Sequence, residues 1–355
     1  MSAGEVDLLA GPKTPGADHE KTGQPDQPKP DRGHPPFAHR IAVTKVHRCG
    51  QQPGSGEPIP QYPLNSDSQA AAEAKAAELL SQATVDNPHP LALVELPAEG
   101  IVAAMCGQVL AAAGNERDLA GVGVGVPGLI RDGVIEEAPN LPQLKGCRMA
   151  EMLAGQLRNE GIEAPVAIIN DADGFAAGIA ASIGKLDSVI RVWTLGIGIG
   201  YGRYPLTAGV WEGGHTVVTL DDKENYCGCG GRGHLEGVMG HRSMRLRFLD
   251  MEPEEIFETA KTGDARCMDF KRLWHKALAA ATATSVHLRG PGRFFLAGFN
   301  VRFVDMPMLK DYMTQMVKMS PLQSYSIEIV GDDAPTRVVG AAVAAEQAAL
   351  RNFPI

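Results

Sequence analysis

Short β-branched or apolar runs alternate regularly with longer alanine-rich segments along most of this 355-residue chain. Runs typical of buried strands lie at residues 91–96, 119–126, 166–170 and 189–195. Segments with helical spacing of apolar residues lie at 98–113, 149–159 and 174–183. This alternation predicts an α/β protein with a largely parallel or mixed sheet. Only 5% of the residues are aromatic, which favours close helix–sheet packing over an aromatic-rich β sandwich.

The two ends of the chain differ from this pattern. Residues 1–37 contain seven prolines and five glycines among polar residues, and we expect a disordered tail there. Order is expected to begin near Ala38, with a strand at 41–46 and a capped helix at 69–83. After residue 240 the chain is expected to be mainly helical, with helices at 253–262, 268–288, 305–319 and 341–351 and strands at 293–297 and 326–329.

Charge and hydropathy exclude several classes of protein. The net charge is −9 and no long basic run is present, which argues against nonspecific binding to nucleic acid or to an anionic membrane. The most apolar span, residues 91–114, is interrupted by Glu95, Pro97 and Glu99, so we do not expect a membrane helix. No basic region followed by an apolar stretch opens the chain, and the expected compartment is the reducing cytoplasm.

The strongest local signal is a group of metal-ligating residue types. His215, Cys227, Cys229 and His234 lie within twenty residues of one another, among several glycines. Thiolate and imidazole together suit a tetrahedral Zn²⁺, and the glycines allow the tight loop that such a site requires. The alternative is a glycine-rich surface loop that carries two incidental thiols.

Two further signals are more ambiguous. Asn170 and Asp171 end a predicted buried strand, where open α/β sheets bind ligands, and an aspartate there can accept a proton from a substrate hydroxyl. The alternative for this pair is a helix cap. Glycines alternate over residues 196–202 and again over 121–128, which fits either a phosphate-binding loop or a tight connection between packed strands. Asn140 is either a turn residue or a ligand contact.

These motifs occur in the order found in one family. The matching stretches are GVGVPGLIRDGVIEEAPNLP (123–142), INDADGFAAG (169–178), LGIGIGYG (195–202), EGGH (212–215), CGCGGRGHLE (227–236), FFLAGF (294–299) and GDDAPTRVVGAAVAA (331–345). On these stretches the chain resembles the ROK family of sugar kinases and sugar-responsive repressors. The resemblance covers roughly residues 121–345.

The resemblance implies an actin-like ATPase (ribonuclease H-like) fold, with two α/β domains around a cleft. It places residues 38–142 and 338–355 in a small α/β domain, and residues 143–337 in a large α/β domain with the zinc loop. Homodimers are common in the family, so a homodimer is expected by analogy.

The resemblance also implies roles for residues. Asp171 matches the general base that takes the proton from the sugar hydroxymethyl group. The implied sugar contacts are Asn140, Asn170, Asp171, Glu212, His215 and Glu236. Zinc is implied at His215, Cys227 and Cys229, and His234 stands where the family has a third cysteine, so a structural site of two histidines and two cysteines is expected. Gly196, Gly198 and Gly200 match the second phosphate loop, and Gly298 matches the adenosine segment, so ATP and Mg²⁺ are the implied cofactors.

The chain departs from the family at both phosphate loops. Family kinases open with Asp-x-Gly-Gly-Thr-Lys, whereas this chain keeps only Thr44 and Lys45, without the four preceding residues. Ile197 replaces a threonine in the second loop. Two hypotheses follow: an ATP-dependent hexose kinase acting on the 6-hydroxyl of a hexose or N-acetylhexosamine, or a non-catalytic sugar-binding pseudokinase on the same scaffold. A repressor is disfavoured, because residues 1–37 hold no pattern for a DNA-binding module.

Overall fold

A computed structural model describes residues 2–3, 42–47, 96–139, 141–186, 188–207, 209, 211–331 and 334–351. For residues 2–3, 42–47, 334 and 351 it describes the backbone alone. Asn140, the predicted helix at 69–83 and all of the predicted tail except residues 2–3 lie outside the described residues.

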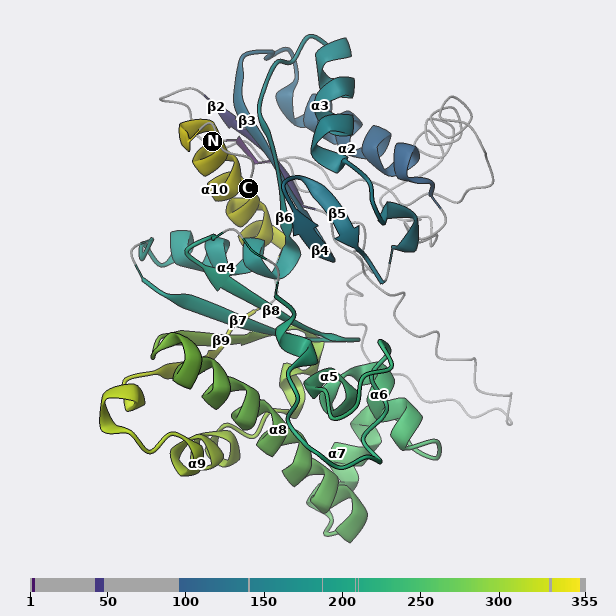
Figure 1. Cartoon of the computed structure of the whole chain (residues 1–355), viewed down its shortest axis with the longest axis vertical. Coiled ribbons are helices and arrows are strands. Elements are labelled where there is room, and N and C mark those ends of the chain that lie inside the picture. The colour runs from purple at the N-terminus through teal and green to yellow at the C-terminus, as the bar shows by residue number, and fades with distance from the viewer. Residues whose placement is uncertain are drawn as a thin grey trace, which may run out of the picture.

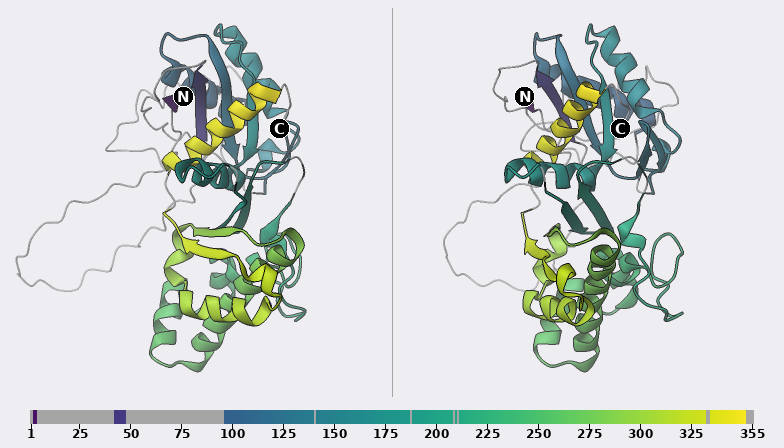
Figure 2. Two further views of the ribbon diagram at one scale, coloured as in Figure 1. Left: turned by 90° about the vertical axis from the view of Figure 1, so that its left-hand side faces the viewer. Right: turned by 60° about the vertical axis from the view of Figure 1, so that its left-hand side comes forward.

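The first sheet has the strand order β1-β2-β3-β6. Its strands are β1 (Ser2–Ala3), β2 (Ala42–His47), β3 (Leu119–Val126) and β6 (Val166–Asn170). β3 and β6 are parallel, so both end at the same edge, whereas β2 runs antiparallel to β3. Helices α2 (Ala98–Ala113) and α3 (Met149–Asn159) cover one face, and α10 (Ala334–Arg351) crosses the other (Figures 1 and 2). A hairpin of β4 (Leu129–Arg131) and β5 (Val134–Glu137) follows β3.

The second sheet has the order β10-β9-β7-β8. Its strands are β7 (Ile190–Leu195), β8 (Ile199–Tyr204), β9 (Arg293–Ala297) and β10 (Ser326–Ile329). β7, β9 and β10 are parallel, and β8 turns back on β7 through the glycine run. On one side lie α5 (Leu235–Met239), α6 (His241–Arg247), α7 (Pro253–Lys261), α8 (Ala265–Arg289) and α9 (Met306–Met316) (Figure 1).

Helix α4 (Asp171–Ser182) lies between the two sheets and contacts β7, β8 and α10 (Figure 1). Small residues allow these elements to approach closely. A Cβ atom on Gly340 would lie 1.6 Å from the Gly174 carbonyl oxygen, and one on Gly178 would lie 1.8 Å from that of Thr336. These contacts hold the first two turns of α10 against residues 174–178 of α4, and so restrict how the two helices can move relative to each other.

Strand pairing bears on the predicted domain boundary. The sequence interpretation assigned residues 143–337 to the large domain, yet β6 pairs with β3, and Leu153 and Leu157 of α3 are buried in the core of the first sheet. We therefore propose a boundary at the junction of β6 and α4 instead of at residue 142. The predicted closing helix at 341–351 begins earlier, at Ala334, because Pro335 is tolerated in a first helical turn.

No helix among the described residues is long and apolar enough to cross a membrane.

Candidate functional site

The first turn of α4 separates the roles of Asn170 and Asp171. Asn170 is the cap: its Oδ1 accepts hydrogen bonds from the backbone N–H groups of Ala172 (2.9 Å) and Asp173 (3.3 Å), and its Nδ2 donates to the Gly128 carbonyl (2.9 Å). The helix-cap alternative therefore applies to Asn170. Asp171 is left at the first helical position with a half-buried carboxylate at the carboxyl edge of β3 and β6.

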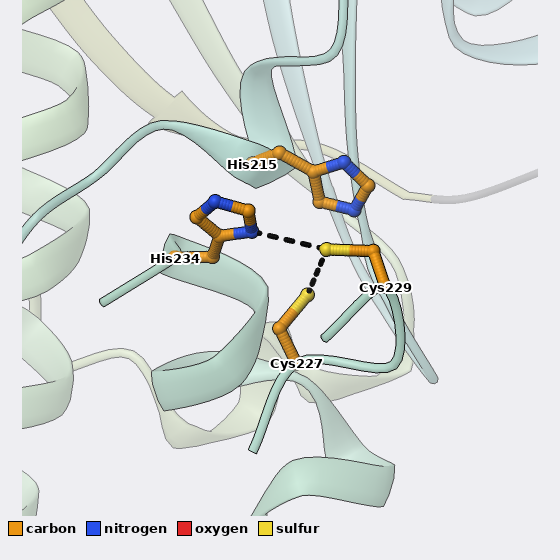
Figure 3. A group of neighbouring side chains, drawn as sticks. All are labelled: His215, Cys227, Cys229 and His234. Carbon is orange, nitrogen blue, oxygen red and sulfur yellow. Dashed lines mark hydrogen bonds between the residues drawn. The ribbon is translucent and has the colours of Figure 1, made fainter. Parts of the chain in front are cut away.

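The four predicted metal ligands lie together (Figure 3). One ligand atom from each of His215, Cys227, Cys229 and His234 lies within 4.8 Å of the others. Cys229 Sγ is 3.4 Å from Cys227 Sγ and 3.2 Å from His234 Nδ1. Ligand atoms of a tetrahedral zinc site stand about 3.5–4 Å apart, so a small shift of these side chains would accommodate the ion. Thiolate and imidazole are also the donors that zinc prefers.

Local backbone explains this cluster. The backbone of 227–233 turns tightly, with Gly230 and Gly233 at positive φ (82° and 67°), and a Cβ on Gly231 would lie 2.1 Å from the His234 ring. An isolated β-bridge between Val217 and His234 brings the segment that follows His215 beside the end of the 227–233 turn. Side chains larger than hydrogen at Gly231 would displace His234 from the cluster.

Glu236 connects the Cys/His cluster to the glycine hairpin. Its Oε2 accepts a hydrogen bond from the Ile199 N–H (3.0 Å), while Oε1 lies 3.6 Å from Cys227 Sγ and 3.9 Å from His215 Nε2. Burial acts to raise the pKa of Glu236, but the neighbouring His215 and the hydrogen bond from the Ile199 N–H lower it overall, so the carboxylate stays ionised.

Glu212 lies in the same electrostatic neighbourhood. Its pKa is raised, first by burial of the carboxyl and then, against the opposing charge of His215, by the charges of Glu236 and Asp171. The structure thus gathers Asp171, Glu212, His215 and Glu236, which come from three separate stretches of sequence, around one region.

The glycines of the hairpin between β7 and β8 are needed for packing, whether or not a ligand binds there. A Cβ on Gly200 would lie 2.3 Å from Thr194 Oγ1, and one on Gly202 would lie 1.8 Å from the Ala172 carbonyl oxygen. The carbonyl of Gly196 accepts from the His241 N–H (3.0 Å) and from Asn300 Nδ2 (3.0 Å). The tight-hairpin explanation therefore accounts for Gly200, while Gly196 and Gly198 form the turn itself.

Gly298 lies beside this turn. It follows β9 with φ 93°, and a Cβ there would lie 2.4 Å from the Leu195 carbonyl oxygen. The predicted phosphate loop and the predicted adenosine segment are thus neighbours in space. Thr44 and Lys45, in contrast, lie within β2 opposite Gly123 and Val122, so their backbone is part of a strand instead of a loop. Whether any of these residues contacts ATP stays a prediction.

One residue beside Asp171 was not predicted from the sequence as a site residue. Arg337 of α10 is buried, and its Nη1 lies 3.7 Å from Asp171 Oδ2. Its position on a helix at the far end of the chain gave no local signal, because only the packing of α10 on α4 brings it to Asp171.

The sequence model of the ROK family matches residues 69–348, which is most of the chain. The chain belongs to the ROK family. A glucokinase from Pyrobaculum calidifontis (strain DSM 21063 / JCM 11548 / VA1) is 29% identical over 201 residues, covering 52% of this chain and 64% of that protein. The ROK chain thus spans less than two thirds of this relative's length.

Solved structures establish the fold of this ROK protein. A ROK hexokinase from Thermus thermophilus matches with a TM-score of 0.56 at 22% identity, covering 72% of this chain and 87% of that one. A ROK family glucokinase from Streptomyces griseus, solved with glucose and AMPPNP, matches with a TM-score of 0.52 at 23% identity, covering 71% and 89%. The α/β fold is therefore the actin-like ATPase fold, as the resemblance implied.

Proposed function

We propose that this ROK protein is an ATP-dependent hexose kinase that phosphorylates the 6-hydroxyl of a hexose or N-acetylhexosamine. The observation that carries the proposal is the grouping of Asp171, at the carboxyl edge of the first sheet, with Glu212, His215 and Glu236, the last of which is bonded to the hairpin of the second sheet. The similarity to a glucokinase supports a sugar as the acceptor.

Asp171 is the proposed general base. As the oxygen of the sugar hydroxyl forms a bond to the γ-phosphorus, the bond from phosphorus to the ADP oxygen breaks, and the hydroxyl proton passes to a carboxylate oxygen of Asp171. Asp171 Oδ1 shares the Ala172 N–H (3.0 Å) with Asn170 Oδ1 (2.9 Å), which restricts the direction in which the carboxylate points. Such positioning supplies much of the rate enhancement in phosphoryl transfer.

The remaining sugar contacts are proposed at Asn140, Asn170, Glu212, His215 and Glu236. Carboxylates, amides and an imidazole together offer acceptors and donors for several hydroxyl groups at once. ATP is proposed at Gly196, Gly198, Gly200 and Gly298 of the second sheet, and at Thr44 and Lys45 of β2 in the first sheet. When bound, Mg²⁺ would neutralise charge on the phosphates.

Zinc is proposed as a structural ion held by His215, Cys227, Cys229 and His234. The compact cluster and its donor chemistry fit this ion. Its role would be to hold the loop that presents His215 and Glu236, because Glu236 connects that loop to the Ile199 N–H of the hairpin.

A coupled assay tests the proposal. Purified protein is mixed with Mg-ATP and a panel of hexoses and N-acetylhexosamines, and ADP release is followed. We expect turnover with at least one sugar and a loss of at least 100-fold in Asp171→Asn. Sugar-dependent thermal stabilisation without any turnover would replace the kinase with the sugar-binding pseudokinase.

A further inference from the structure

Arg337 approaches Asp171 from a different part of the fold. It lies in the first turn of α10, while Asp171 opens α4, and the distance from Arg337 Nη1 to Asp171 Oδ2 is 3.7 Å. Only 9% of the Arg337 side chain and 34% of the Asp171 side chain are exposed. An ion pair screened from water to this extent is stronger and better fixed than one on the surface.

A ring contact and the packing of α10 on α4 restrict where the guanidinium can lie. Its Cζ lies 4.8 Å from the centroid of the Phe175 ring, one turn along α4 from Asp171. The backbones of α4 and α10 touch at Gly174–Gly340 and at Gly178–Thr336, so the two helices have little freedom to slide. The position of Arg337 beside Asp171 is therefore a property of the helix–helix joint.

Asp171 lies among other acidic groups. In addition to their burial, which is the larger cause, the charge of Asp171 raises the pKa of Glu212 and of Asp173. A neighbouring positive charge on Arg337 offsets the repulsion among these carboxylates.

Both carboxylate oxygens of Asp171 are thereby given a partner. The Ala172 N–H donates to Oδ1, and Arg337 faces Oδ2. Resting on the function proposed above, we propose that Arg337 is a positioning residue for the reaction: it holds the Asp171 carboxylate in the orientation that accepts the proton of the sugar hydroxyl.

The test combines steady-state kinetics with chemical rescue. In Arg337→Met, which keeps an apolar stem over Phe175, kcat is expected to fall 10- to 100-fold while KM for sugar and for ATP changes less than about threefold. Arg337→Lys is expected to retain an intermediate kcat, because it keeps the charge but not the planar donor. In Arg337→Ala, guanidinium at millimolar concentration is expected to restore part of kcat, whereas urea is not.

Arg191 provides a matched control. It is also buried, lies 5.0 Å over the Phe294 ring and donates to the carbonyls of Arg289 and Gly290, away from Asp171. Arg191→Met is expected to lower the melting temperature without a selective fall in kcat.

The outcomes separate the two proposals. If the wild-type protein shows no turnover, or Asp171→Asn keeps it, the proposed function fails and the role of Arg337 fails with it. If the wild type is active and depends on Asp171, but Arg337→Met keeps its kcat, the inference about Arg337 alone is overturned. If Arg337→Met does not fold, Arg337→Lys decides instead. The inference is overturned if Arg337→Lys keeps the wild-type kcat and guanidinium does not rescue Arg337→Ala.

Discussion

Asp171 and Asp173 lie two residues apart on α4, and the fold gives their carboxyl groups opposite surroundings. Asp171 is half-buried and faces Arg337. Asp173 is 8% exposed, and its Oδ1 accepts a hydrogen bond from the Arg203 N–H (2.8 Å). Burial raises the pKa of Asp173 to about 7, against the hydrogen bond and charge of Arg203. Of these two aspartates, Asp171 therefore has the more exposed carboxylate, and it is the one proposed as the base.

The raised pKa of Asp173 predicts that the stability of the fold depends on pH. Its folded-state pKa lies above its unfolded value, so between about pH 4 and 7 the folded state binds a proton that the unfolded state releases. The free energy of unfolding contributed by this group falls as pH rises through that window. Asp173→Asn keeps the acceptor for the Arg203 N–H but carries no charge, so we expect it to raise stability at pH 8 by about 1–2 kcal/mol and to change it little at pH 5.

Urea denaturation at both pH values measures this effect. The exposed Asp118→Asn serves as the control and is expected to change stability by less than about 0.5 kcal/mol at either pH. Equal effects of Asp173→Asn at pH 5 and pH 8 would show that burial does not hold the Asp173 proton.

Residue-scale prediction from the sequence succeeded where neighbours in sequence are neighbours in space. The grouping of His215, Cys227, Cys229 and His234 follows from a short glycine-rich stretch, and the structure brings the four together. Arg337 could not be predicted, because its partner Asp171 lies in a distant segment and the contact depends on how α10 packs on α4.

At the scale of elements, the proposal that zinc holds the loop at 212–236 can be tested directly by chemical analysis. If zinc holds it, purified protein will contain about one equivalent of zinc per chain, measured by inductively coupled plasma mass spectrometry without chelator. His234→Ala is expected to lose most of the zinc, because only three ligands remain, whereas His234→Cys is expected to keep it.

Removal of the ion provides the second half of this prediction. Dialysis against a chelator is expected to lower the melting temperature and to weaken sugar binding, because Glu236 and His215 belong to the same loop. Less than half an equivalent of zinc in the wild-type protein, unchanged in His234→Ala, would contradict the metal site.

The alternation of strands and helices predicted most elements, but not those too short to show a regular spacing of apolar residues. The hairpin of β4 and β5 and the short helices α5 and α6 were not predicted, since three to seven residues are too few to show a period. The glycine run was recognised, yet its second half is a strand, β8, whose glycines accommodate α4. The sequence could not separate packing from ligand binding there, because both need the absence of a side chain.

At the scale of the whole molecule, the joint between α4 and α10 links the two sheets. α4 contacts β7 and β8 of the second sheet, and α10 contacts β2 and β3 of the first. A Cβ on Gly340 would overlap the Gly174 carbonyl oxygen at 1.6 Å, which a backbone contact cannot relieve by a rotamer change. The relative placement of the sheets therefore depends on residues of minimal size at this joint.

Gly340→Ala tests the joint. We expect a loss of about 2–3 kcal/mol in the free energy of unfolding, because overpacking of this kind forces the helices apart. Gly107→Ala is the matched control: Gly107 is exposed in the interior of α2 with nothing within 4 Å of a Cβ, so alanine there should stabilise by about 0.5–1 kcal/mol. Equal effects of the two substitutions in chemical denaturation would mean that α4 and α10 do not meet as described.

The fold class and family followed from the sequence because the motifs are spread along the chain in a fixed order, and the family match and the solved relatives confirm both. The boundary proposed at the junction of β6 and α4 could not be predicted, because β6 pairs with a strand that lies about forty residues earlier, and pairing across such a separation leaves no local pattern.

The most direct measurement is ³¹P NMR of a reaction that contains the protein, Mg-ATP and the sugar that stabilises it best. We predict a new phosphomonoester resonance of a sugar 6-phosphate that grows as the ATP γ-phosphate signal declines, and no such resonance with Asp171→Asn. Growth of inorganic phosphate alone, or the same sugar phosphate from Asp171→Asn, would contradict a kinase that uses Asp171 as its base.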